Sequence, residues 1–264
     1  MLIQILILLV SLVTLVWSAD KFVFGASSLA RNFGISPMVI GLTIVAMGSS
    51  APEMMIAATA SLDGNANLAI GNAIGSNIAN IALVLGITAL FQPLIVSSST
   101  VKREIPLILF ITALAYWMLS DSYFGFNEGL SLMIGFFVYI IALLLITLKA
   151  AKNTPVVDPL IIEAEQEVPE AVSKPISIFW LVVGMVLLPM SAVYLVDSSV
   201  FIAKAFGISD LVIGLTVVAI GTSLPELAAS IMSIIKKEDD LALGSIIGSN
   251  IFNIFAVLSL AGLI

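Results

Sequence analysis

The sequence predicts an all-α polytopic membrane protein with an inverted-topology repeat. Its 264 residues are 60% hydrophobic and only 10% charged, with a mean hydropathy of +1.19, whereas about a quarter of the residues in soluble domains are charged. Apolar segments of about 20 residues, the length that crosses a bilayer, follow one another along the chain. One stretch of sequence occurs twice, 173 positions apart.

Composition also limits the chemistry. The chain has no cysteine and no histidine, which excludes disulfides, thiolate metal sites and imidazole chemistry. A bound cation would therefore be a hard ion with oxygen ligands, such as Na⁺, K⁺, Ca²⁺ or Mg²⁺. We expect no enzyme and no cofactor, because no nucleophile stands beside a base. The net charge of −7 comes partly from one loop and does not indicate nucleic-acid binding; the expected partner is the lipid bilayer.

We expect eight membrane spans. The first, Leu2 to Ala19, has no basic residue before it and Lys21 after it, which favours a retained span over a cleaved secretory signal. The predicted spans are 2–19, 38–60, 69–91, 104–120, 127–148, 176–203, 211–235 and 241–264.

Three regions follow from these spans. Residues 1–148 form the first repeat, with its motif at 41–81, and residues 176–264 form an incomplete second repeat, with its motif at 214–254. Between them, residues 149–175 hold several acidic residues and prolines, which is typical of a solvated loop. We expect this loop to be cytoplasmic.

The basic residues predict the orientation. Cytoplasmic loops of membrane proteins carry an excess of lysine and arginine. Nine of the ten basic residues lie in odd-numbered connections, and Lys204 alone lies in an even-numbered one. The sequence therefore places the odd connections in the cytoplasm and the N-terminus outside. The nine are Lys21, Arg31, Lys102, Arg103, Lys149, Lys152, Lys174, Lys236 and Lys237.

The internal repeat is extensive. Residues 33–53 and 206–226 are identical at fifteen of twenty-one positions, and the same offset aligns 71–81 with 244–254 at eight of eleven. Five spans precede the second copy, so the two copies lie upside down relative to each other. Inverted repeats place binding sites near the bilayer midplane. Spans four and five would have counterparts near 277–321, so we expect a plan of five plus five helices, of which about eight spans are present.

Each copy carries one glutamate deep in an apolar run, Glu53 and Glu226. A carboxylate at that depth costs about 2.5 kcal/mol or more unless it is paired or solvated, so the symmetric pair indicates a bound cation. The alternative is a protonated glutamate that helps helices to pack. The preceding prolines, Pro52 and Pro225, lack an N–H and break a helix. Broken backbone at membrane depth is tolerated where it lines protein or a water-filled cavity.

Neutral oxygen donors accompany each glutamate. Ser49 and Ser50 precede Glu53 by four and three residues, on its helical face. On the next helix Ser76 and Asn80 share a face, four residues apart. As an alternative, such side chains join membrane helices by hydrogen bonds. The matching residues of the second copy are Thr222, Ser223, Ser249 and Asn253. The small-residue pairs Gly71/Gly75 and Gly244/Gly248 are expected to allow close helix approach.

The chain resembles the cation/Ca²⁺ exchanger superfamily, in its bacterial and archaeal sodium/calcium exchanger branch of the YrbG type. The resemblance lies in two "G-[S/T]-S-x-P-E" elements and two "G-S-N-I-x-N-I" elements. It implies that Glu53 and Glu226 are central ligands shared by Ca²⁺ and Na⁺. It also implies a multi-pass protein of the cell (inner) membrane.

The resemblance implies further roles. Ser49 and Thr222, with Ser50 and Ser223 beside them, would complete the Ca²⁺ site and the flanking Na⁺ sites. Ser76 and Ser249, with the carbonyls of Ala46 and Ala219, would serve outer Na⁺ positions, and Asn80 and Asn253 would line the middle. Some relatives have aspartate at the place of Asn253, so this chain has two site carboxylates where those relatives have three.

The resulting hypothesis is an antiporter that exchanges Na⁺ for Ca²⁺ across the plasma membrane. A loaded, neutralised core would slide past the first and sixth spans, whereas an empty, doubly charged core would meet a desolvation barrier. Three alternatives stay open: a Ca²⁺/H⁺ exchanger of the same superfamily, a passive cation channel and a scaffold that transports nothing. Oligomeric state is not predicted.

Overall fold

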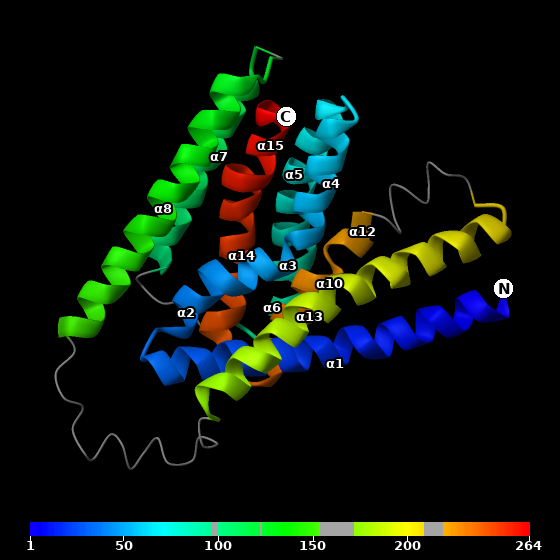
Figure 1. Ribbon diagram of the computed structural model, residues 1–264, viewed down its shortest axis with the longest axis horizontal. Helices are drawn as coiled ribbons and strands as arrows, with labels where there is room; N and C mark the ends of the chain where they lie inside the picture. The colour runs from blue at the N-terminus through cyan, green and yellow to red at the C-terminus, as the bar shows by residue number, and fades with distance from the viewer. Residues whose placement is uncertain (95, 97–99, 122, 154–171, 209–218) are drawn as a thin grey trace.

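A computed structural model describes the chain except residues 95, 97–99, 122, 154–171 and 209–218 (Figure 1). The described residues form α-helices interrupted by short π-helices, which are labelled η. Most of the predicted acidic loop, and residues 214–218 of the second motif, lie outside the described residues. The helices are α1 (Leu2–Phe33), α2 (Pro37–Ile40), η1 (Gly41–Val45), α3 (Ala46–Ser49), α4 (Ala51–Leu62), α5 (Ala66–Ala79), η2 (Asn80–Leu85), α6 (Gly86–Phe91), η3 (Thr100–Glu104), α7 (Ile105–Leu119), α8 (Phe126–Asn153), α10 (Lys174–Ala205), α12 (Ala219–Thr222), α13 (Leu224–Ile235), α14 (Asp239–Phe252), η6 (Asn253–Val257) and α15 (Leu258–Leu263).

The first helices of the two repeats show the inversion directly. Helices α1 and α10 are each 32 residues long. They lie side by side and run in opposite directions, α1 away from the N-terminus and α10 back towards it (Figure 1). Equivalent helices that run antiparallel are what an inverted-topology repeat requires. The predicted all-helical fold with inverted repeats is therefore confirmed.

The repeat is also visible in the positions where helices begin and in the backbone φ angles where they end. Helices α3, α4 and α5 begin 173 residues before α12, α13 and α14 respectively. Gly34 and Gly207 both end a helix with positive φ, of 61° and 76°. Gly64 has φ 73°, and its equivalent Lys237 has φ 60°, a conformation that residues other than glycine rarely adopt. The turn geometry is thus kept even where the glycine is not.

Among the described residues, five helices are long and apolar enough to cross a membrane, or six if the bent pair Pro37–Ser49 and Ala51–Leu62 is one span. The eight-span count and the outside N-terminus remain predictions. The first span ends later than predicted, since α1 continues past Ala19 to Phe33. Asp20 and Lys21 pair with each other at 3.0 Å, so these charges do not end the helix. Gly34 ends it instead.

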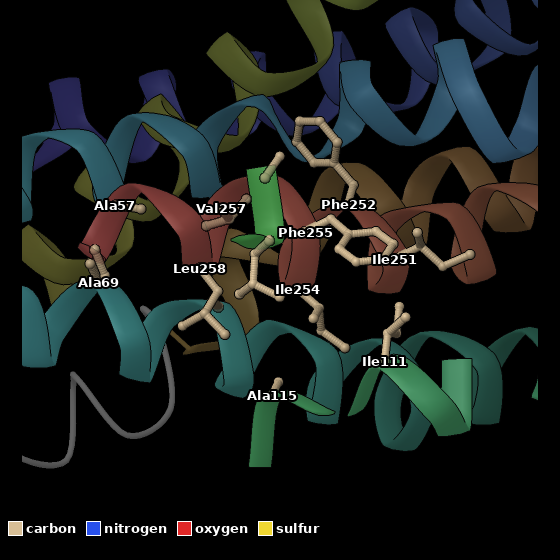
Figure 2. Packing of buried hydrophobic residues seen from close by; sticks show 14 of the residues in the cluster. Ala57, Ala69, Ile111, Ala115, Ile251, Phe252, Ile254, Phe255, Val257 and Leu258 are labelled. Carbon is tan, nitrogen blue, oxygen red and sulfur yellow. The ribbon is translucent and has the colours of Figure 1, made fainter. Parts of the chain in front are cut away.

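Equivalent helices are covered unequally. In the last candidate span, Asp239–Leu263, all residues of the apolar 18-residue stretch are buried, whereas 22% are buried in the corresponding stretch of its counterpart, Ala66–Phe91. Helix α8 packs on α15 and η6, and α7 packs on α14 and η6. In Figure 2, Ile254 and Leu258 of this segment lie on the side of Ile111 and Ala115 of α7, and Phe252 lies on the other side, where its ring packs 5.5 Å from that of Phe136 of α8. Helices α2 and η1 also pack on α14, so the C-terminal motif segment is enclosed by four neighbouring elements.

Close approach through glycine holds the second motif helix. A Cβ placed on Gly244 would lie 2.6 Å from the carbonyl oxygen of Met38, and one on Gly248 would lie 2.7 Å from Cα of Leu42. A Cβ on Gly71 or Gly75 has no neighbour within 4 Å among the described residues. By the repeat, the segment that these two would meet is 214–218, which is outside the described residues. The close packing that we predicted is therefore present at Gly244 and Gly248.

Ion pairs connect α1 to the turn between α13 and α14. Lys236 lies 2.7 Å from Asp20, and Arg31 pairs with Glu238. All four side chains are partly exposed, and such surface pairs contribute about 0–1 kcal/mol each. They therefore fix the position of α1 on α13 without accounting for much of the stability.

Candidate functional site

Both glutamates follow a break between two short helices. The chain bends by 48° between Pro37–Ser49 and Ala51–Leu62. Ser50 stands at the break with φ −85° and ψ 13°, and its equivalent Ser223 has φ −90° and ψ 4°. Pro52 and Pro225 lie at the start of the helix that follows, where a missing N–H costs nothing. The prolines therefore fix the break that puts Glu53 and Glu226 in first turns.

The two carboxylates are buried and held by hydroxyls. Glu53 and Glu226 are each 1% exposed. Ser50 donates to Oε1 of Glu226 at 2.9 Å, and Ser76 donates to Oε1 of Glu53 at 3.5 Å. The Ser50 bond joins the two repeats, so the carboxylates belong to one cluster.

A second contact joins the repeats at Ser49. Its hydroxyl lies 3.4 Å from that of Ser249 and donates to the carbonyl of Ala46 at 3.3 Å. The same carbonyl accepts the backbone N–H of Ser50 at 3.0 Å. Both lone pairs of the Ala46 carbonyl are thus used, and a cation there would have to replace the Ser49 hydroxyl.

Asn80 and Asn253 mark a feature that the sequence did not predict. Each is the first residue of a π-helix, η2 or η6. Both side chains are buried, at 1% and 0% exposure, and neither amide has a hydrogen-bond partner among the described residues. π-Helical turns are rare and gather at functional sites, so these two amides are well placed to accept a ligand.

The predicted ligands that remain to be placed are Thr222, Ser223 and Ala219, all in the second repeat. Ser223 is buried, and its hydroxyl has no partner among the described residues. Thr222 and Pro52 line the same cavity of about 350 Å³ beside the break. Ala219 begins α12, and its side chain is not among those described. Hydrogen bonds thus join Ser50 to Glu226, Ser76 to Glu53 and Ser49 to Ser249, and no described hydrogen bond connects Asn80 or Asn253 to this cluster.

The two glutamates of the cluster have no ion-pair partner among the described residues. Each carboxylate keeps one oxygen, Oε2, with no hydrogen-bond partner among the described residues. Unpaired charge in a protein interior is costly. The described part of the chain has no group of three or more carboxylates for a metal, so the donor set is two carboxylates with hydroxyls and amides. Such oxygen donors fit Ca²⁺ and Na⁺ as substrates.

Sequence reasoning missed two asparagines. Asn72 donates from Nδ2 to the backbone carbonyl of Glu53 at 3.1 Å. Asn77 donates to the carbonyl of its own repeat equivalent, Asn250, at 3.2 Å. The signal for Asn72 was its position one helical turn before Ser76 on α5, which puts both on one face.

A family model described as "Sodium/calcium exchanger protein" matches residues 3–145 and 176–264. This chain belongs to the sodium/calcium exchanger family. The match spans both repeats and omits most of the stretch between them, in agreement with the motifs that carried the resemblance.

Relatives cover the whole chain. CaxA of Alkalimonas amylolytica is 54% identical over 264 residues, which is 100% of this chain and 82% of the relative. Inner membrane protein YrbG of Escherichia coli K12 is 41% identical over 100% of this chain and 81% of its own length. Sodium/calcium exchanger MaX1 of Methanosarcina acetivorans is 35% identical over 99% of this chain and 83% of its own.

A solved exchanger shares the fold. The sodium-calcium exchanger NCX_Mj, soaked with 2.5 mM Na⁺ and 0.1 mM Ca²⁺, superposes with a TM-score of 0.82 at 34% identity. The superposition covers 99% of this chain and 82% of NCX_Mj. At family level the chain is a multi-pass membrane antiporter for Na⁺ and Ca²⁺, and its relatives are transporters and not enzymes.

Proposed function

We propose that this chain exchanges Na⁺ for Ca²⁺ at the cluster formed by Glu53 and Glu226. One observation carries the proposal: two buried carboxylates, joined through Ser50, each keep a free oxygen and have no described cationic partner. A cation that enters the cluster supplies the missing charge. The inverted repeat favours a location near the bilayer midplane.

Charge balance explains why the site would exchange ions and not leak them. One Ca²⁺ neutralises both carboxylates, and Na⁺ ions in neighbouring positions do the same. The empty site has two negative charges whose transfer through a low-dielectric barrier is costly. Only a loaded core would then move past α1 and α10, the antiparallel pair that lies across the core (Figure 1). Each Ca²⁺ that leaves is therefore replaced by Na⁺.

We assign the other proposed ligands to Ca²⁺ or to Na⁺ according to their position. Ser49, Ser50, Thr222 and Ser223 lie at the breaks and would complete the Ca²⁺ site. Ser76 and Ser249, with the Ala46 and Ala219 carbonyls, would serve Na⁺. The free amides of Asn80 and Asn253 face no described partner and would offer carbonyl oxygens to either ion.

The direct test uses the purified chain in proteoliposomes loaded with Na⁺. We expect radiolabelled Ca²⁺ uptake on dilution into Na⁺-free buffer, and loss of that uptake when an ionophore removes the Na⁺ gradient. Uptake driven by a pH step without Na⁺ would instead identify a Ca²⁺/H⁺ exchanger. Uptake that follows membrane potential regardless of internal Na⁺ would identify a channel, and no uptake under any condition would contradict transport by this chain.

Removal of the Ser50 hydroxyl should weaken Ca²⁺ binding. Ser50→Ala leaves the Glu226 carboxylate without its 2.9 Å donor, and a hydrogen bond to a charged group is worth about 1.5–3 kcal/mol. We expect the Ca²⁺ concentration for half-maximal uptake to rise about 10- to 150-fold. Ser61→Ala is the matched control, because the Ser61 hydroxyl is buried in α4 but donates only to the Ala57 carbonyl. Equal effects of the two substitutions would remove Ser50 from the site.

A further inference from the structure

The two glutamates are held in different ways, although their repeats are related. Glu53 is held by its own repeat: the Ser76 hydroxyl reaches its carboxylate at 3.5 Å, and Asn72 reaches its backbone carbonyl at 3.1 Å. Glu226 is held through its carboxylate by Ser50, which comes from the other repeat. Sequence similarity alone would predict equal support for both.

The Asn72 bond acts on the backbone that carries the ligand. Asn72 lies four residues before Ser76, so both side chains project from one face of α5 towards α4. Glu53 is in the first turn of α4, directly after the break at Ser50. The bond from Asn72 therefore ties this first turn to α5, while Ser76 orients the carboxylate itself.

The second repeat lacks an equivalent bond among the described residues. The position of Asn72 is taken by Ser245, which is 1% exposed. The Ser245 hydroxyl has no hydrogen-bond partner among the described residues. A serine side chain is shorter than an asparagine side chain and has no amide to extend to the neighbouring helix. Glu226 thus has no described anchor on its backbone carbonyl from α14.

We propose that Asn72 is a positioning residue that preorganises Glu53 for Ca²⁺ by fixing the backbone of the first turn of α4. The proposal rests on the proposed exchange function. Affinity for Ca²⁺ depends on the rigidity of its ligands as well as on their charge, and a ligand fixed beforehand loses less conformational freedom on binding. A backbone bond that holds Glu53 before Ca²⁺ arrives would therefore raise the affinity for Ca²⁺ without changing the ligands themselves.

The test replaces Asn72 with the residue that the second repeat has. For Asn72→Ser we expect the Ca²⁺ concentration for half-maximal Na⁺-driven uptake to rise about fivefold, the value of one hydrogen bond. The maximal rate should stay unchanged, because the ligands themselves are intact. Ser245→Ala is the matched control and should leave half-saturation unchanged. A fall in melting temperature with unchanged half-saturation would overturn the proposal and leave Asn72 a purely structural residue.

A second measurement separates this inference from the exchange function. Ca²⁺ that binds the folded state raises the melting temperature of the detergent-solubilised chain. We expect Asn72→Ser to need about fivefold more Ca²⁺ for half of that rise. If the wild-type chain is protected by Ca²⁺ but exchanges nothing, the exchange function fails and the role of Asn72 is still measured. Equal Ca²⁺ dependence in both chains, or no protection of the wild type, would overturn the inference.

Discussion

Glu226→Gln and Glu53→Gln should each abolish Na⁺-driven Ca²⁺ uptake. Either substitution keeps the shape of the side chain but leaves one carboxylate for two positive charges. Since Glu53 and Glu226 are 1% exposed, the excess charge would stay in a low-dielectric site. An uncompensated buried charge costs about 3–5 kcal/mol, so we expect a loss of more than about 100-fold in uptake rate at a fixed low Ca²⁺ concentration.

The melting temperatures of the same variants distinguish a loss of charge in the site from a loss of folding. In ion-free buffer both variants should melt at or above the wild-type temperature, because a neutral amide is cheaper to bury than a carboxylate. Glu238→Gln is the control, since Glu238 pairs with Arg31 outside the cluster, and it should keep near wild-type uptake. Coupled uptake that survives in Glu53→Gln or Glu226→Gln would exclude that glutamate as a central ligand.

Gly184→Leu should disrupt the pairing of α1 with α10. A Cβ on Gly184 would lie 2.5 Å from Cβ and 2.6 Å from Cα of Phe22, so the clash is with backbone that cannot rotate away. Membrane helices gain little from apolar burial against lipid and depend on close packing through small residues. Overpacking of this kind costs about 3 kcal/mol. We expect a clearly lower melting temperature in detergent and loss of exchange.

The control for this substitution is Gly86→Leu at the start of α6. No described residue lies within 4 Å of a Cβ on Gly86, so the larger side chain has room there and should leave the melting temperature near that of the wild type. Exchange should also persist. A Gly184→Leu variant as heat-stable as Gly86→Leu would show that α1 and α10 can separate without loss, contrary to the packing described above.

Much of the site follows from local sequence. Pro52 and Pro225 fix where the helices break, because proline removes an N–H wherever it stands. Glu53 and Glu226 can be identified as candidate ligands because a charged side chain in an apolar membrane segment is costly unless a partner or water compensates it. The 173-residue offset relates the two copies, and the five spans predicted before the second copy give their inversion. These properties depend on residue type and spacing, and the structure reproduces them at Ser50 and Ser223.

The tertiary structure decided what spacing could not. Helix α1 continues through the charged residue Asp20 because Lys21 and Lys236 pair with it, and the π-helices that begin at Asn80 and Asn253 were seen only in the structure. The different support of Glu53 and Glu226 arises because Asn72 and Ser50 reach across helix boundaries. A sequence repeat makes two halves alike in type, but packing contacts form between particular atoms, and there the halves differ.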